Sequence, residues 1–358
     1  MKSKRWITCG VLAFIVVLLA VALPVYFYNR PLGPSLALNK PAFAAEGNDP
    51  SVVVQPIQEQ TVQATSTNQA QPARATSVST SEAPRTNVYK KGTCGGEGTV
   101  NLLLLGESLK ASAPHGADAI RLVVVDYDQP AVRILAMPPE LLVKTSLLKE
   151  IKSTTLTKAY WYGKQPPPNR EPAAVRNATR VVAQALLDNF GFQTEKYLTL
   201  KEEVFVKMVN TLGGVEVDVP ERVDGTAEGY GIYEAGNQVM NGKRALDYVR
   251  MLQPAGHAPN EWDRVSRQNQ VIYGIQAAVL KPKNWLKIPS LINDFYQFLY
   301  TDLSPKDLVS LNCMIKTVGD NVTVLEVTPE MVTTGPNGVM RPDEKAIRQL
   351  IDDLQYGD

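Results

Sequence analysis

The sequence predicts a layered α/β domain over about Val100 to Met314. Short runs of Val, Ile and Leu that end at turn residues predict buried strands. Apolar residues at helical spacing follow these runs, and strands mixed with helices in this order are typical of layered α/β folds. The chain has 358 residues, of which 44% are hydrophobic and 20% charged, so it can form one core of ordinary size.

Three apolar runs predict the first strands, namely Val100 to Leu105, Ile120 to Val125 and Val132 to Met137. Gly106 ends the first of them. Further on, Val215 to Val219 alternates valines with acidic residues, which predicts a strand with one buried face.

Helices are expected where apolar residues recur every three or four positions, as in Val175 to Leu186 and Val204 to Leu212. The second of these runs ends at Gly213 and Gly214, and glycine is the usual residue after a helix. A longer helix is predicted from Trp262 to Leu280. Helices that follow strands in this way favour the layered fold.

The N-terminus predicts a membrane anchor. Lys2, Lys4 and Arg5 precede an uncharged, largely apolar segment from Trp6 to Asn29, and about 20 such residues span a bilayer. The positive-inside rule then places residues 1–5 in the cytoplasm and the rest of the chain outside, as a single-pass protein of the cell membrane. The alternative is a cleaved signal peptide with a site at Ala42-Phe43-Ala44, farther from the apolar segment than cleavage usually tolerates.

Composition divides the remainder into three parts. Residues 30–90 are rich in Pro, Ser, Thr and Gln and predict a disordered linker. The α/β domain is expected at 95–315. Residues 316–358 predict a strand (Val322 to Val327) and a closing helix (Pro342 to Leu354), added at the edge of the same sheet.

Charge and cysteine content exclude several classes of protein. The net charge of +1 provides no basic field for nucleic acid, so no nucleic-acid partner is expected. Cys9, Cys94 and Cys313 cannot form a cluster of zinc spacing. Cys94 and Cys313 flank the domain outside the cytoplasm, where disulfides persist, so we predict that they pair; the alternative is two free thiols.

Two regions concentrate candidate site residues. The loop from Gly106 to Asp118 follows a predicted strand and contains Glu107, Ser108, Lys110 and His115, and ligands of α/β sheets bind in such loops. No P-loop and no Ser-His-Asp pattern accompanies it.

The second region extends from Ala245 to Gln270 and contains Arg250, Arg264, Arg267 and Gln268. Arg264 and Arg267 are three residues apart on one predicted helix and share a face. Clustered guanidinium groups suit phosphate oxygens. The alternative is a solvated helix face whose arginines pair with nearby acids.

The order and spacing of several blocks resemble the LytR-CpsA-Psr family of cell-envelope proteins. The blocks are NLLLLG, ADAIRLVVVDYDQPAVRILAMP, LTKAYWYG, GGVEVDVP, AGNQVMNGKRALDYVR and RVSRQNQVI, between about Asn101 and Leu280. The resemblance implies an α/β/α sandwich with a central mixed sheet and an apolar channel for a polyprenyl chain. It also implies transfer of a glycopolymer from a polyprenyl-pyrophosphate carrier in the cytoplasmic membrane to peptidoglycan.

By this resemblance, Asp118 and Glu107 would bind Mg²⁺, and Asp118 and Arg250 would be catalytic. The phosphate-binding residues would be Arg250, Arg264, Arg267, Gln268 and Lys110. Phosphoryl transfer depends mainly on positioning and charge neutralisation, which this residue set suits.

The sequence departs from the family pattern at several charged positions. The acid of the family's Gly-x-Asp loop falls on Ser108, the family's lysine falls on Thr155, and three family arginines are replaced by Gly116, Pro139 and Leu252. Arg121 is not expected to substitute, because strand alternation would direct it away from Asp118. Two functions therefore stay open: a phosphotransferase with reduced activity, and a non-catalytic protein that binds the lipid carrier or a cell-wall partner.

Overall fold

The computed structural model describes residues 28–39, 94–108, 116–165, 171–285, 287, 300–319, 321–335 and 338–357. Its centre is a six-stranded mixed sheet in the order β11-β6-β1-β2-β3-β12. The pairs β1/β2, β2/β3 and β6/β11 are antiparallel, and β1/β6 and β3/β12 are parallel. The six strands are β1 (Thr99–Glu107), β2 (Ala117–Asp126), β3 (Ala131–Met137), β6 (Lys196–Lys201), β11 (Tyr300–Thr301) and β12 (Val322–Glu326).

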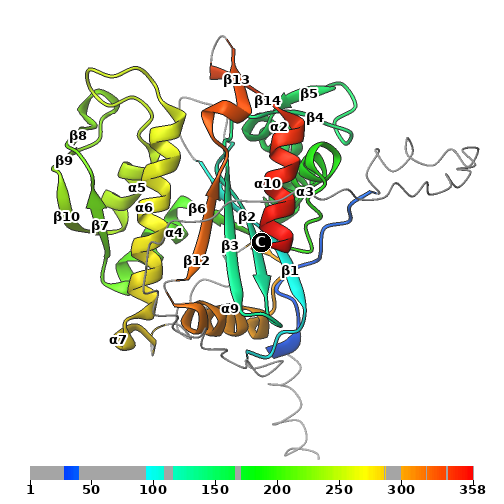
Figure 1. The fold of residues 1–358 in the computed structure, drawn as a ribbon, viewed down its shortest axis with the longest axis horizontal. Coiled ribbons are helices and arrows are strands. Elements are labelled where there is room, and N and C mark those ends of the chain that lie inside the picture. Colours follow the sequence, from blue (N-terminus) through cyan, green and yellow to red (C-terminus); the bar gives the residue numbers. More distant parts are fainter. Residues whose placement is uncertain are drawn as a thin grey trace, which may run out of the picture.

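Helices cover both faces of this sheet (Figure 1). On one face lie α2 (Leu156–Lys164), α3 (Glu171–Phe190) and α10 (Glu344–Tyr356). On the other lie α4 (Glu202–Leu212), α5 (Gly242–Arg250), α6 (Glu261–Leu280) and α9 (Pro305–Val318). The expected α/β/α sandwich with a central mixed sheet is confirmed.

Short elements complete the described part of the chain. Beside α6 lies a two-stranded sheet, formed by β7 (Val215–Val219) and β10 (Gly236–Met240). The other short elements are β4 (Leu142–Lys144), β5 (Ser153–Thr155), β8 (Val223–Asp224), β9 (Ile232–Tyr233), β13 (Val332–Thr334), β14 (Met340–Pro342), α7 (Pro282–Trp285) and two 3₁₀ turns, Thr226–Glu228 and Pro329–Met331.

Strand alternation divides the side chains of the central sheet between two interiors. Leu103, Leu105, Leu122 and Val124 are fully buried against α2, α3 and α10. Their neighbours Leu102 and Val123 face the opposite layer with α9. Each central strand is therefore apolar on both faces, which explains why it reads as a continuous apolar run.

The predicted elements agree with those observed, with ends that differ by a few residues. Gly213 ends α4 in the left-handed conformation, at a φ of 86°, as its position after the helix predicted. The C-terminal strand β12 joins the sheet edge beside β3, as expected. The expected boundary between residues 315 and 316 falls inside α9. The predicted Cys94–Cys313 disulfide is present and connects the segment before β1 to α9.

The predicted disorder of residues 30–90 was wrong for the first ten of them. A docked arm, Arg30–Asn39, lies along the domain (blue in Figure 1). The backbone N–H of Leu32 donates to the carbonyl of Leu303 at 3.0 Å, and Arg180 Nε donates to the carbonyl of Ala37 at 2.8 Å. Leu36 and Leu38 pack against the core under α3. Two apolar contacts and backbone hydrogen bonds hold a segment whose composition alone gave no sign of order.

Most of the expected membrane anchor, Trp6–Asn29, lies outside the described residues. Within the described ranges, every helix is too short or too polar to cross a bilayer.

Candidate functional site

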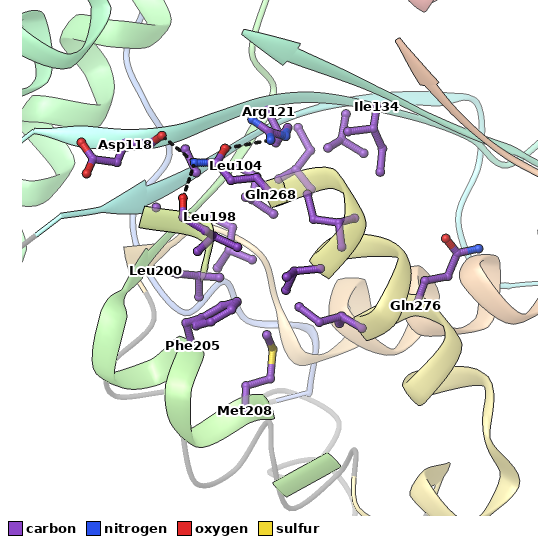
Figure 2. Close-up of a pocket in the computed structure, with 18 of the residues that line it drawn as sticks. Leu104, Asp118, Arg121, Ile134, Leu198, Leu200, Phe205, Met208, Gln268 and Gln276 are labelled. Carbon is purple, nitrogen blue, oxygen red and sulfur yellow. Dashed lines mark hydrogen bonds between the residues drawn. The ribbon is translucent and has the colours of Figure 1, made fainter. Parts of the chain in front are cut away.

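A cavity of about 410 Å³ lies between the central sheet and the helices α4, α6 and α9 (Figure 2). Its wall is mostly apolar. Residues such as Leu104, Leu198 and Leu200 line it from the sheet, Phe205 and Met208 from α4, and Ile275 from α6. This volume is within the range of small-molecule sites, so it can enclose part of a long apolar chain.

Charged and polar residues line the cavity at one end of the central strands. We call this set the charged end; it consists of Glu107, Ser108, Asp118, Lys201, Glu202 and Arg250. Glu107 and Lys201 are paired neighbours at the C-terminal ends of the parallel strands β1 and β6. Asp118 is the second residue of the antiparallel β2, at the same end of the sheet. Figure 2 shows Asp118 at one end of the cavity, with the apolar side chains beyond it.

A bulge between β1 and β2 determines where Asp118 points. Gly106 pairs with Ala119 and Glu107 with Ala117, so Asp118 has no partner in the register. An extra residue of this kind interrupts the alternation of side chains. Asp118 and Arg121 consequently line the same cavity. The regular alternation assumed for this strand did not predict that both residues line one cavity, although Figure 2 shows the Asp118 carboxylate directed away from the Arg121 side chain.

Arg264 lies among three carboxylates next to the cavity. Its Nη2 is 2.6 Å from Oε1 of Glu261, and its Nη1 is 3.8 Å from Oδ2 of Asp118. Burial raises the pKa of the Glu261 carboxyl, an effect that Arg264 partly offsets. Burial also raises the pKa of Glu140, and the charge of Arg264 again acts in the opposite direction. Arg264 therefore lies in one cluster with Asp118, the buried Glu261 and the half-buried Glu140.

Three other cations at or beside the charged end also have carboxylate partners. Arg250 Nη1 lies 3.1 Å from Oε2 of Glu202. Lys164, at the C-terminus of α2, pairs with the buried Glu107. Lys201 pairs with Glu171. An anion bound here would therefore contact cations that already have a carboxylate partner.

Arg267 and Gln268 make other contacts than the predicted ones. Arg267 donates to the backbone carbonyls of Tyr248 and Met251 and closes the C-terminal end of α5. Gln268 Nε2 donates to the Asp118 carbonyl at 3.2 Å, and its Oε1 accepts from Arg121 at 2.9 Å. Arg267 does not line the cavity, whereas Gln268 does. Lys110 lies outside the described residues.

Sequence reasoning missed Lys164, Lys201 and Glu202 at this site. Lys201 is the last residue of β6 and Glu202 directly follows it, and the C-terminal end of β6 lies beside that of β1. Ligand sites of α/β sheets form at such strand ends, so this signal was available once β6 and β1 were known to be parallel neighbours. Lys164 could not be found in this way, because only the packing of α2 brings it to Glu107.

Fold and site together define an α/β/α protein with an apolar cavity that has a charged end, which suits an amphipathic ligand with a long apolar tail. The LytR_cpsA_psr family matches residues 54–355. The chain belongs to this family, the LytR-CpsA-Psr family.

Comparison with known proteins gives relatives of low sequence identity. The chain is 24% identical over 173 residues to the polyisoprenyl-teichoic acid–peptidoglycan teichoic acid transferase TagV of Bacillus subtilis (strain 168), a match that covers 45% of this chain and 44% of that protein. The match therefore spans less than half of the length of that relative.

Solved structures show the same fold over most of their length. The crystal structure of B. subtilis TagV matches with a TM-score of 0.57 at 18% identity, over 75% of this chain and 99% of that chain. A LytR-Csp2A-Psr enzyme from Actinomyces oris matches with a TM-score of 0.55 at 22% identity, over 74% and 92%. TagT bound to LIIa-WTA matches with a TM-score of 0.55 at 20% identity, over 76% and 94%.

Proposed function

We propose that this chain is a membrane-anchored phosphotransferase that moves a glycopolymer from a polyprenyl-pyrophosphate carrier to peptidoglycan. The observation that carries the proposal is the apolar cavity with charges gathered at one end. A polyprenyl chain gains free energy by leaving water, about 0.8 kcal/mol for each buried CH₂. The relative TagV, a polyisoprenyl-teichoic acid–peptidoglycan teichoic acid transferase, supports the same substrate class.

The proposed reaction is a phosphoryl transfer. A sugar hydroxyl of peptidoglycan attacks the phosphorus that bears the glycopolymer and loses its proton. A phosphodiester forms, the bond between the two phosphates breaks, and polyprenyl phosphate leaves with the electron pair. Arg250 and Arg264 would neutralise the phosphate oxygens, and Gln268 would keep the Asp118 backbone in place. Electrostatic stabilisation by positioned groups contributes most to such reactions.

Magnesium is part of this proposal, with Asp118 and Glu107 as ligands. Oε2 of Glu107 is buried without a hydrogen-bond partner, so it is free for a cation. In the described ranges no cluster of three or more His, Cys, Asp or Glu suits a metal ion. Mg²⁺ commonly takes one or two carboxylates and fills its other positions with water and substrate phosphates, so these two residues fit it. When bound, the ion would neutralise charge on the diphosphate.

A non-catalytic lipid-binding protein is the second candidate function. The observation that favours it is the pairing of the cations at the site with acids of the same chain. Three arginines of the family pattern are also absent, and loss of a single preorganised donor costs about two to three powers of ten in rate. The cavity would serve both functions equally well.

The test compares Asp118→Ala and Arg250→Ala with the exposed control Lys243→Ala on α5, whose partner is Asp247. Purified proteins receive a polyprenyl-pyrophosphate-linked glycan, peptidoglycan fragments and Mg²⁺. We expect transfer by the wild type and the control and none by the two site variants, while all bind the lipid, because the apolar chain supplies most of that affinity. Binding without Mg²⁺-dependent transfer by the wild type would establish the non-catalytic function.

A further inference from the structure

Arg121 is a charged residue of the cavity wall that lies outside the charged end. It pairs with Leu104 and Ala136 in the middle of the sheet, and its side chain faces the cavity. It is 1% exposed. Along β2 it lies two residues beyond Ala119, or roughly 7 Å farther into the cavity.

The partners of this guanidinium are neutral. Nη2 donates to Oε1 of Gln268 at 2.9 Å and to Oδ1 of Asn269 at 3.1 Å, and Nη1 donates to the Ile120 carbonyl at 3.0 Å. Nε is buried without an acceptor. Among the described residues no carboxylate forms a salt bridge with Arg121. The charge of Glu326 affects Arg121 only from a longer distance, because Asn269 lies between them and donates its side-chain amide to Glu326.

A buried cation without an anion in contact is costly, by several kcal/mol per ion even after relaxation. Burial lowers the pKa of Arg121 to about 10, so the group is still charged at neutral pH. An anion that enters the cavity would offset this cost and would satisfy the free Nε–H.

We propose that Arg121 binds a phosphate oxygen of the lipid ligand inside the cavity. This inference rests on the proposed binding of a prenyl phosphate or diphosphate, and it adds a specificity-determining residue to that site. The phosphate group then lies between Asp118 and Arg121, deeper than the charged end alone would place it. Arg121 thereby contributes a cation at a site from which other cations of the family pattern are missing.

A purely structural role for Arg121 makes a different prediction. If the guanidinium served only to orient Gln268 and Asn269, its loss would change the cavity for every lipid, with or without a phosphate. A phosphate-binding role affects only ligands that carry the anion. The two roles are separated by comparing a prenyl diphosphate with the corresponding alcohol.

The experiment measures the affinity of the full chain for geranylgeranyl diphosphate, geranylgeraniol and inorganic pyrophosphate by calorimetry. In Arg121→Met we expect affinity for the diphosphate lipid to fall about tenfold or more, the scale of a lost charge-assisted hydrogen bond. Affinity for the alcohol should stay within about twofold, because the wall remains apolar. Lys281→Met, which removes an exposed cation paired with Glu216, should change neither.

A second variant neutralises Arg121 without removing it. Asn269→Asp combined with Glu326→Gln moves one carboxylate into contact with Arg121, keeps the net charge, and preserves a hydrogen bond between the two changed residues. We expect the same selective loss for the diphosphate lipid. This variant decides the matter even if Arg121→Met does not fold.

Equal losses for diphosphate and alcohol, or no loss for the diphosphate, would overturn the inference. Tight binding of inorganic pyrophosphate alone that depends on Arg121 would identify a free anion, not the lipid, as the ligand, and would also contradict it. The proposed transfer activity is tested separately with Asp118→Ala and Arg250→Ala, so failure of the Arg121 proposal leaves that result unaffected.

Discussion

At the residue scale, charge pairing dominates the site. Arg250 pairs with Glu202, Lys164 with Glu107, and Arg264 with Glu261 and Asp118. Side chains held in this way lose little conformational entropy when a ligand binds, which favours preorganised binding. The same acids reduce the positive field that a diphosphate would meet. Because the site is preorganised but carries a reduced positive field, it suits binding of a diphosphate lipid better than rapid phosphoryl transfer.

One departure from the family pattern has a direct steric reason. A Cβ atom at position 116 would lie 2.9 Å from the Thr157 carbonyl oxygen and closer still to its hydroxyl. An arginine therefore does not fit at Gly116 without movement of α2. Substitution at Gly116 alone therefore cannot restore the missing family charge. A cation elsewhere in the site, such as Arg121, would have to neutralise the phosphate in its place.

The pair formed by Lys164 and Glu107 gives a stability prediction. Glu107 is fully buried and Lys164 is largely so. Lys164→Met should lower the free energy of unfolding by about 3 kcal/mol, because it leaves an unpaired buried carboxylate. The double variant Lys164→Met, Glu107→Gln should recover most of this loss, since no buried charge remains.

Urea denaturation measures both effects. Lys243→Met is the control: it breaks an exposed pair with Asp247 and should change stability by less than about 1 kcal/mol. A loss for Lys164→Met no larger than that of the control would show that the pair does not stabilise the fold.

The sequence predicted the types of residue at the site better than their contacts. Asp118, Glu107, Arg250 and Gln268 all line the cavity, as the block pattern implied. Arg121 was misplaced because a bulge depends on the register between two strands, which one sequence does not specify. The contacts of Arg267 with carbonyls at the end of α5 were not predicted, because they come from tertiary packing.

At the scale of elements, strong local signals gave correct predictions. The strands β1, β2 and β3 are largely apolar runs. The N-cap of α6 is Asn260, whose side chain accepts from the backbone N–H of Trp262. Short pairs such as β4/β5 and β8/β9 were not predicted. Strands of two or three residues carry too little periodicity to be distinguished from loops.

The composition of the docked arm gave no indication that this segment is ordered. Its stability can be tested with Leu38→Ala, which removes a half-buried side chain packed on the core. We expect a loss of about 1 to 2 kcal/mol in the free energy of unfolding, less than for a fully buried leucine. Ser35→Ala, an exposed position in the same arm, should be neutral.

Hydrogen exchange of α3 gives a second measurement for the same variant. Release of the arm should expose the central turns of α3 around Arg180 and Gln184, which contact it. Unchanged stability and unchanged protection in Leu38→Ala would mean that the arm does not pack on the domain in solution.

At the scale of the whole molecule, the chain combines an expected membrane anchor, the docked arm and the α/β/α domain. Lys2, Lys4 and Arg5 before the apolar segment, with Arg30 after it, are expected to orient the chain with its N-terminus in the cytoplasm. The domain would then stand outside, where the proposed acceptor peptidoglycan lies. The arm joins the expected anchor to the domain beside Leu303, just before α9.

Protease treatment of intact spheroplasts tests this topology. The domain should be degraded from outside, and in untreated cells it should stay with the membranes after washing in high salt. A cytoplasmic protein of the same cells, protected from the protease, is the control for intact membranes. Recovery of the domain in the cytosolic fraction would be incompatible with both proposed functions.

In both proposed functions the cavity under β1, β2 and β6 holds the lipid carrier, with its phosphates at the charged end. A crystal structure of the protein with geranylgeranyl diphosphate can check this placement. We expect the prenyl chain to lie against Leu104, Phe205 and Ile275, with phosphate oxygens near Asp118, Arg121 and Arg250. A chain bound elsewhere, or a diphosphate held outside these residues with the cavity collapsed, would contradict it.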